Sequence, residues 1–187
     1  MTAPLIVGLG GTTRPGSSSE RLASAVLDAC AARGARTLLF GGAALAQLPH
    51  FAPEAPERTT EQAEFVAAVR EAAGLVIATP GYHGGVSGLV KNAIDLLEDT
   101  REDSRAYFTD MPVGLIVSAA GWQATGVTLA ALRGIVHAMR GWPTPVGIGV
   151  NSLAQRLFEG GGALTDAGVY AAVEEQARQI MRLARLQ

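Results

Sequence analysis

The amino-acid sequence predicts a single α/β domain in which a five-stranded parallel sheet is covered by helices on both faces. Short apolar runs alternate along the chain with longer segments of helical periodicity, as in strands joined by helical crossovers. Two glycine-rich loops, residues 10–19 and 79–88, each follow a strand-like run and lead into a helix-like one. The 187 residues are enough for one substantial core, and no linker or internal repeat divides residues 1–187.

The predicted elements follow in order along the chain. Continuous apolar runs, typical of strands buried on both faces, predict strands at residues 4–9, 37–40, 75–79, 113–118 and 145–150. Helical periodicity predicts helices at residues 19–33, 59–73, 88–98, 125–140 and 166–186. Ser17 with Glu20, and Thr59 with Gln62, have the spacing of capping boxes at the first two helices. Loops are expected at the proline-rich residues 48–58, the polar residues 100–110 and the glycine run 160–162.

Composition excludes several classes of protein. A net charge of -2 without a cluster of Lys and Arg argues against nucleic-acid binding. No apolar run has the length of a membrane span and no signal-peptide pattern is visible, so a soluble cytoplasmic protein is expected. Cys30 is the single cysteine, which excludes an internal disulfide, and we expect it to be buried in the first helix. His50 and His137 lack metal-ligand spacing, so no metal site is predicted.

Three loops are expected to meet at one edge of the sheet, because each follows the carboxyl end of a strand. They are residues 10–19, 79–88 and 118–123. The first two are rich in glycine and hydroxyl residues and precede helices, where free backbone N–H groups suit a phosphate. A P-loop is excluded because Ser17 and Ser18 stand where its lysine is needed. The dinucleotide fingerprint is also incomplete, since Thr13 replaces its third glycine and Gly41 follows the second strand in place of an acidic residue.

Two segments together match a known family: Gly11-Thr12-Thr13-Arg14-Pro15-Gly16-Ser17, and Thr79-Pro80-Gly81-Tyr82-His83-Gly84 through Gly88-Leu89-Val90-Lys91-Asn92-Ala93-Ile94-Asp95. They resemble the NADPH-dependent FMN reductase family. The resemblance implies a flavodoxin-like three-layer sandwich with strand order 2-1-3-4-5, FMN as the cofactor and NADPH or NADH as the electron donor. It implies that the FMN phosphate is bound by Thr12, Arg14, Ser17 and Ser19. It places the flavin beside the second loop, at Pro80, Gly81, Tyr82, His83 and Gly84, and beside the third, at Ser118, Ala119, Gly121 and Trp122.

The flavin supplies the redox chemistry in such an enzyme, so no catalytic side chain is assigned. Family members often carry a glutamate where this chain has Gly81, which leaves any contact of that carboxylate open. Tyr82 is expected at the edge of the flavin, and His83 is expected to contribute backbone contacts. Trp142 is expected in a core or an interface. Lys91 and Asp95 lie four residues apart and either pair within their helix or reach across a subunit interface.

The electron acceptor stays open at this stage. Free flavin, a quinone, an azo or nitro compound, a biosynthetic substrate and a partner flavin-dependent monooxygenase are all compatible with the resemblance. The resemblance also implies a homodimer or homotetramer. Two alternatives are a flavodoxin-type electron carrier and a flavin-loaded regulatory module, neither of which oxidises NAD(P)H itself. Carriers tend to be strongly acidic, and the net charge of -2 argues against that class.

Overall fold

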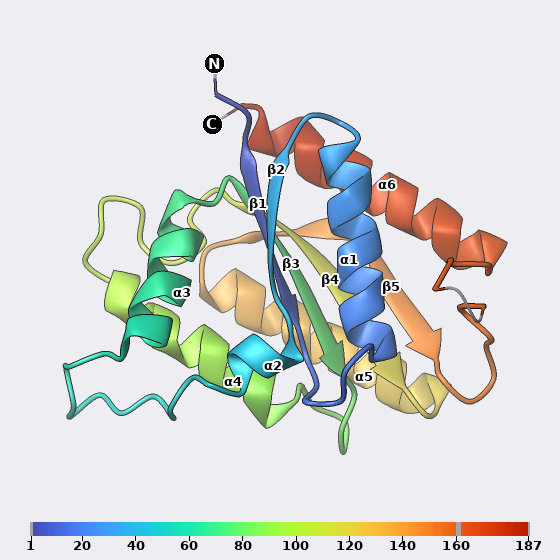
Figure 1. The fold of residues 1–187 in the computed structure, drawn as a ribbon, viewed down its shortest axis with the longest axis horizontal. Coiled ribbons are helices and arrows are strands. Elements are labelled where there is room, and N and C mark those ends of the chain that lie inside the picture. The colour runs from blue at the N-terminus through green and yellow to red at the C-terminus, as the bar shows by residue number, and fades with distance from the viewer. Residues whose placement is uncertain (1, 160–161, 187) are drawn as a thin grey trace.

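The computed structural model describes residues 2–159 and 162–186, so part of the glycine run at residues 160–162 lies outside the described residues. The chain forms a three-layer α/β sandwich around a five-stranded sheet (Figure 1). The strands are β1 (Leu5–Gly10), β2 (Arg36–Phe40), β3 (Gly74–Pro80), β4 (Pro112–Ala119) and β5 (Trp142–Asn151). All neighbouring strands are parallel and their order is β2-β1-β3-β4-β5, which confirms the predicted fold class.

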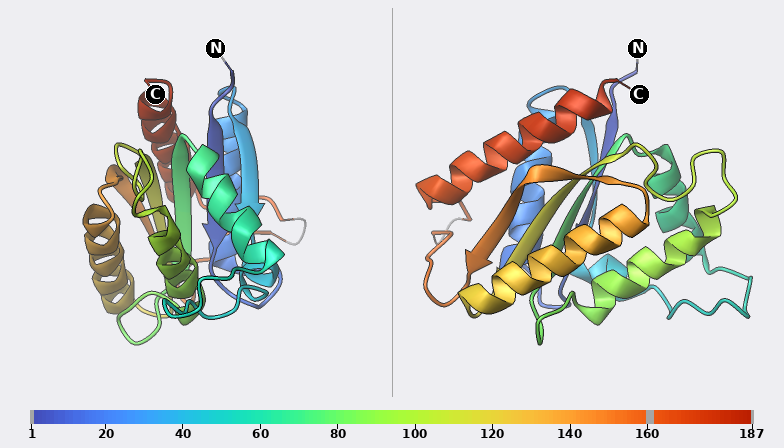
Figure 2. Two further views of the ribbon diagram at one scale, coloured as in Figure 1. Left: turned by 90° about the vertical axis from the view of Figure 1, so that its left-hand side faces the viewer. Right: turned by 180° about the vertical axis from the view of Figure 1, so that it is seen from behind.

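The helices are α1 (Ser18–Ala31), α2 (Gly42–Leu45), α3 (Thr60–Glu71), α4 (Gly88–Asp95), α5 (Trp122–Ala138) and α6 (Ala167–Ala184), with a 3₁₀ helix η1 at Leu96–Thr100. Helices α1 and α6 cover one face of the sheet, and α3, α4 and α5 cover the other. In the left view of Figure 2, α3 and α4 lie in front of the strands. None of the helices in the described residues is both long enough and apolar enough to cross a bilayer.

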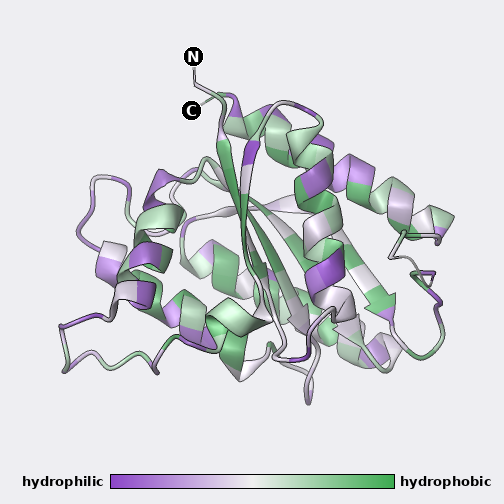
Figure 3. Cartoon of the chain, in the orientation of Figure 1, coloured by the Kyte–Doolittle hydropathy of each residue, from purple (hydrophilic) through white to green (hydrophobic). Residues whose placement is uncertain are grey.

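Two apolar cores flank the sheet, because its central strands are buried on both faces. All seven residues of β3 are buried, and the strands are mostly hydrophobic while the helices alternate between hydrophobic and hydrophilic residues (Figure 3). Phe65 of α3 packs edge-to-face on Phe40, with 5.1 Å between the ring centroids. On the other face Cys30 is buried as expected, and burial raises the pKa of its thiol to about 12.

Several elements differ from the sequence prediction, among them the helix expected at residues 88–98, which is α4 up to Asp95 and η1 from Leu96. Strand β5 begins at Trp142 rather than at residue 145. Its prolines argue against a strand in the sequence, yet Pro143 pairs with Val113 before a register shift in the ladder. Helix α5 begins at Trp122 rather than at Thr125, because its N-cap, Gly121, provides no capping side chain. The short helix α2 was not predicted, since the glycines at positions 41 and 42 indicate a turn.

Two further expectations are met only in part. Residues 101–110 form a loop, as expected of this polar stretch, yet Phe108 within it is fully buried and belongs to the core beside α3 and α4. Of the two places expected for Trp142, the core is excluded, because the side chain is 57% exposed on this chain and its indole Nε1 donates a hydrogen bond to Asp110 Oδ1; an interface stays a prediction. Lys91 and Asp95 do pair within their helix, with Nζ 2.7 Å from Oδ1.

Candidate functional site

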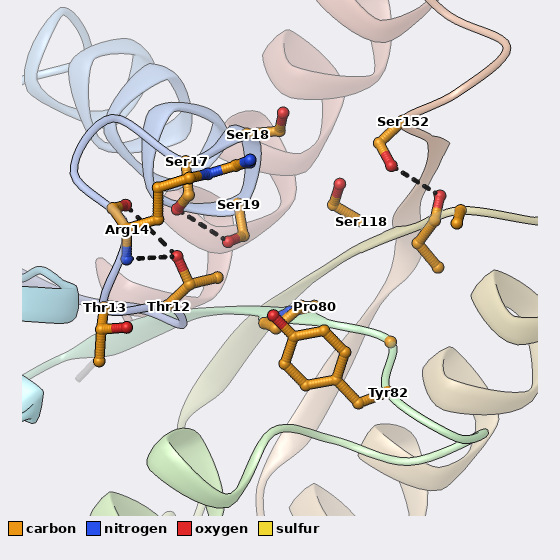
Figure 4. Close-up of a pocket in the computed structure, with 13 residues that line it drawn as sticks. Thr12, Thr13, Arg14, Ser17, Ser18, Ser19, Pro80, Tyr82, Ser118 and Ser152 are labelled. Atoms are coloured by element: carbon orange, nitrogen blue, oxygen red, sulfur yellow. Dashed lines mark hydrogen bonds between the residues drawn. The ribbon is translucent and has the colours of Figure 1, made fainter.

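A cavity of about 360 Å³ opens at the carboxyl ends of the strands, where the strand order reverses between β1 and β3. The described residues that line it come from four loops: Thr12, Thr13, Arg14, Ser17, Ser18, Ser19, Pro80, Gly81, Tyr82, Ser118, Ala119, Ala120 and Ser152. In Figure 4 the serines at the start of α1 lie on one side of this pocket, Ser118 and Ser152 on another, and the Tyr82 ring below them. The predicted meeting of three loops at one rim is therefore confirmed, and a fourth loop joins them.

The first loop is held by its own hydroxyl groups. Thr12 Oγ1 accepts a hydrogen bond from Arg14 N at 3.1 Å, which folds the loop back on itself. Gly16 then adopts a φ of 63°, a left-handed conformation that favours glycine. Ser17 caps α1 by accepting a hydrogen bond from Glu20 N at 3.3 Å, and its Oγ also lies 3.3 Å from Ser19 Oγ. Hydroxyl groups thus collect beside the positive end of the α1 dipole.

The predicted capping box at α1 is only half formed. The Ser17 side chain caps the helix as expected, but the Glu20 side chain does not return to the backbone of Ser17. Glu20 Oε2 instead accepts a hydrogen bond of 2.7 Å from the backbone N of Gly42, at the start of α2. At α3 the corresponding pair, Thr59 and Gln62, forms the complete box. The difference follows from the tertiary contact with α2, which residue spacing alone does not reveal.

Glycines allow the first loop to approach its neighbours closely. A Cβ on Gly11 would lie 2.5 Å from the Ala78 carbonyl oxygen, and one on Gly42 would lie 1.4 Å from the Thr12 carbonyl oxygen. A side chain at either position would therefore displace the loop. Gly42, the second of the two glycines after β2, thus has a packing role.

The second loop carries a tight turn with Tyr82 at its start. Tyr82 N donates to Gly85 O at 3.0 Å, and Gly85 N donates to Tyr82 O at 2.9 Å. Positive φ angles of 52° at His83 and 80° at Gly84 match a type I′ turn. The turn leaves the Tyr82 side chain 56% exposed at the rim of the cavity.

The second loop is also tied to its surroundings. Gly81 N donates to Ser118 O at 2.9 Å, which links it to the third loop. Thr79 Oγ1 accepts a hydrogen bond from Ser87 N at 3.0 Å and so closes the base of the loop. A Cβ on Gly81 would lie 3.0 Å from both Ala119 Cβ and Thr128 Oγ1. Glycine at position 81 therefore lets the second loop lie directly against the third loop and α5.

The cavity includes nine of the predicted site residues: Thr12, Arg14, Ser17, Ser19, Pro80, Gly81, Tyr82, Ser118 and Ala119. Four others lie outside its lining. His83 and Gly84 occupy the tip of the turn, Gly121 caps α5, and Trp122 is 57% exposed on the first turn of α5.

Sequence reasoning missed four residues that line the cavity: Thr13, Ser18, Ala120 and Ser152. The first three lie within loops that were already singled out. Ser152 directly follows β5, so the rule that ligands bind beyond the carboxyl ends of strands could have indicated it. Its hydroxyl donates a hydrogen bond to the Ala119 carbonyl oxygen at 3.2 Å and joins the fourth loop to the third.

The cavity has a polar, positively charged end and a less polar end. Arg14 carries the single formal charge among the lining residues that the structure describes. It shares its end of the cavity with the hydroxyl groups of Thr12 and Ser17 and with the N-terminus of α1. This donor set suits the terminal phosphate of a ligand. The described residues contain no group of three or more His, Cys, Asp or Glu side chains that could hold a metal ion.

The fold and the site thus define a flavodoxin-like protein with a cavity at the strand ends whose rim carries hydroxyl and guanidinium donors. The sequence profile of the NADPH-dependent FMN reductase family matches residues 4–154. The chain therefore belongs to the NADPH-dependent FMN reductase family, whose members are FMN-dependent oxidoreductases that use NAD(P)H as electron donor.

Similar proteins agree with this membership. An FMN-dependent NADPH-azoreductase of Staphylococcus aureus (strain USA300) is 39% identical over 74 residues, which is 40% of this chain and 36% of that protein. The alignment thus spans about a third of the curated relative. An oxidoreductase from Corynebacterium diphtheriae is 22% identical with a TM-score of 0.74, covering 100% of both chains. The flavoenzyme FerB, an NAD(P)H:(acceptor) oxidoreductase from Paracoccus denitrificans, is 17% identical with a TM-score of 0.79, covering 96% of this chain and 98% of FerB. These two structures share the fold of this protein.

Proposed function

We propose that this protein binds FMN in the cavity at the strand ends and oxidises NADPH or NADH, passing the electrons to a small-molecule acceptor. The observation that carries the proposal is the convergence of Arg14, the hydroxyl groups and the α1 N-terminus at one end of a cavity that continues along the backbone of the second loop. A volume of about 360 Å³ lies within the range of small-molecule and cofactor sites. FMN would supply the hydride chemistry, and the protein would supply binding, orientation and electrostatics.

The residues present fit such a cofactor. Thr12, Arg14, Ser17, Ser18 and Ser19 would hold the phosphate, because they offer hydroxyl, guanidinium and backbone N–H donors. The second and third loops would flank the flavin, with Pro80, Gly81 and Tyr82 on one side and Ser118, Ala119 and Ala120 on the other. His83 and Gly84 would act by shaping the turn that places Tyr82. Gly121 and Trp122 would lie farther along the rim.

Backbone N–H groups beside a bound flavin would stabilise the negative charge that it gains on reduction. No described side chain in the cavity needs to act as an acid or base for hydride transfer. A flavodoxin-type carrier is the weaker alternative, since the net charge of -2 provides little of the acidic surface on which carriers dock.

The acceptor proposed for the first test is an azo compound, because an azoreductase is among the relatives that match the chain. The experiment measures NADPH consumption and dye decolorisation under anaerobic conditions, with and without added FMN. We expect both to require the protein and FMN together. NADPH consumption that is independent of FMN would overturn the proposal. Release of reduced FMN into solution, without direct dye reduction by the protein, would instead indicate that free flavin is the acceptor, as supply of a partner monooxygenase would require.

We also propose that the protein is a homodimer through the outer faces of α4 and α5, which lie side by side in Figure 2. A groove of about 380 Å³ between them includes Phe51, Ile94, Ile135 and Met139, which are apolar, and Tyr107 at its edge. Ile94 is buried and the other three are half-buried, and Lys91, Asp95 and Glu98 also line the groove, so a partner would meet an apolar floor with a charged border. Light scattering coupled to gel filtration tests it, with the mass of two chains expected and that of one or four chains contradicting it.

We further propose that the protein is located in the cytoplasm, where its NAD(P)H donor is found.

A further inference from the structure

The two helices that begin with a capping-box sequence use it differently, and the difference lies at the candidate phosphate site. In α3 the Gln62 side chain accepts a hydrogen bond from Thr59 N at 3.0 Å, which completes the box. In α1 the Glu20 carboxylate occupies the equivalent position but accepts its hydrogen bond from Gly42 N at 2.7 Å. The backbone N–H of Ser17 is therefore not taken up by Glu20.

Because Glu20 bonds to Gly42, backbone N–H groups at the start of α1 keep no partner within the helix. Ser18 and Ser19 are the first two residues of the helix, so their N–H groups have no acceptor four residues earlier within it. Ser17 N likewise makes no hydrogen bond among the described residues. All three serines line the cavity. A complete capping box would have occupied one of these three N–H groups.

The Glu20 carboxylate also holds the turn that packs against the first loop. It accepts a hydrogen bond from Gly42 N, and Gly42 lies so close to Thr12 that a Cβ would come within 1.4 Å of the Thr12 carbonyl oxygen. A Cβ on Gly41 would lie 2.9 Å from Glu20 Oε2 itself. Glu20 thus links α1 to the turn between β2 and α2, and that turn supports Thr12, whose Oγ1 in turn accepts the hydrogen bond from Arg14 N.

We propose that Glu20 is a positioning residue for the ligand phosphate: it holds the Gly41–Gly42 turn against the Thr12 loop and leaves the α1 N–H groups to the ligand. The inference rests on the proposed function, since it concerns the same phosphate. It assigns Glu20 a role that depends on the reach of the side chain and not on its charge. The negative charge itself opposes a nearby phosphate, so a neutral side chain of the same length is expected to serve as well.

Three variants separate reach from charge. Glu20→Gln keeps the length and an acceptor oxygen, Glu20→Asp keeps the charge but is one methylene shorter, and Glu20→Ala removes both. The quantity measured is the ratio of the dissociation constants of riboflavin and FMN, because the two ligands differ by the phosphate alone. We expect Glu20→Gln to stay within about threefold of the native ratio, and Glu20→Asp and Glu20→Ala to lower it by about tenfold, the effect of one lost hydrogen bond to a charged group.

Gln62→Ala is the matched control, because it opens the capping box of α3 away from the cavity. It should lower the midpoint of urea unfolding and leave the riboflavin-to-FMN ratio unchanged. Glu20→Asp tests the proposal even where Glu20→Ala does not fold. A native ratio in Glu20→Asp overturns the role of Glu20 while the proposed function stands. Equal affinity of the native protein for FMN and riboflavin overturns the proposed phosphate site and with it this inference.

Discussion

Ser87 connects the two glycine-rich loops, because its Oγ donates a hydrogen bond to the Gly11 carbonyl oxygen over 3.2 Å. The same hydroxyl oxygen accepts a hydrogen bond from Val90 N and so caps α4. Ser87 N donates to Thr79 Oγ1, which closes the second loop. One buried hydroxyl therefore joins the loop assigned to the phosphate to the loop assigned to the flavin.

Replacing Ser87 should loosen both loops together. Ser87→Ala removes an N-cap and leaves the buried Gly11 carbonyl without this donor, so we expect a stability loss of about 1–2 kcal/mol in urea unfolding. FMN affinity should fall by about fivefold, because about 1 kcal/mol of loop order must then be supplied by binding. Thr59→Ala is the control: it removes the α3 N-cap and should lower stability without changing FMN affinity.

Arg14 is the proposed electrostatic partner of the phosphate. Arg14→Ala should weaken FMN binding by about 1.5–3 kcal/mol, the usual worth of a hydrogen bond to a charged group, and leave riboflavin binding unchanged. The FMN affinity of Arg14→Lys should lie between those of the native protein and Arg14→Ala, because lysine keeps the charge but lacks the planar fork of donors. Isothermal calorimetry with both ligands provides the measurement. Unchanged FMN affinity in Arg14→Ala would remove Arg14 from the site.

Gly81 is expected to be required for close packing of the second loop. Gly81→Ala would place a Cβ 3.0 Å from Ala119 Cβ and Thr128 Oγ1, so we expect a loss of stability of about 1–3 kcal/mol and weaker FMN binding. Gly88→Ala is the matched control, since nothing lies within 4 Å of a Cβ there, and it should be neutral or slightly stabilising. A Gly81→Ala protein with native unfolding and native FMN affinity would contradict this reading.

Cys30 links stability to pH at the alkaline end. Burial raises the pKa of its thiol from an ordinary 9.0 to about 12, so the folded chain retains a proton that the unfolded chain loses. Stability due to this group is thus complete below pH 9 and is lost as the pH rises from there toward 12. Cys30→Ala should show a smaller loss of unfolding free energy between these pH values. Iodoacetamide should label the native thiol far more slowly than the urea-unfolded one.

The sheet could be predicted from the sequence because each central strand is a continuous apolar run, and glycine-rich loops mark its carboxyl edge. The first and second loops were found for the same reason. Elements whose structure depends on tertiary contacts were harder to predict. Glu20 turns to Gly42 instead of Ser17, α5 starts after a glycine cap, and Phe108 is buried within a polar segment. Ser152 was missed because a lone serine after a strand carries no composition signal of its own.

The cavity is proposed to hold FMN that accepts electrons from NAD(P)H. The most direct measurement is the visible absorption spectrum of the FMN-loaded protein during anaerobic titration with NADPH. We expect flavin bands that bleach as NADPH is added, and that reappear when an electron acceptor is introduced. A flavin that binds but stays oxidised in excess NADPH and NADH would contradict the proposed oxidation of NAD(P)H and favour an electron carrier or a regulatory module.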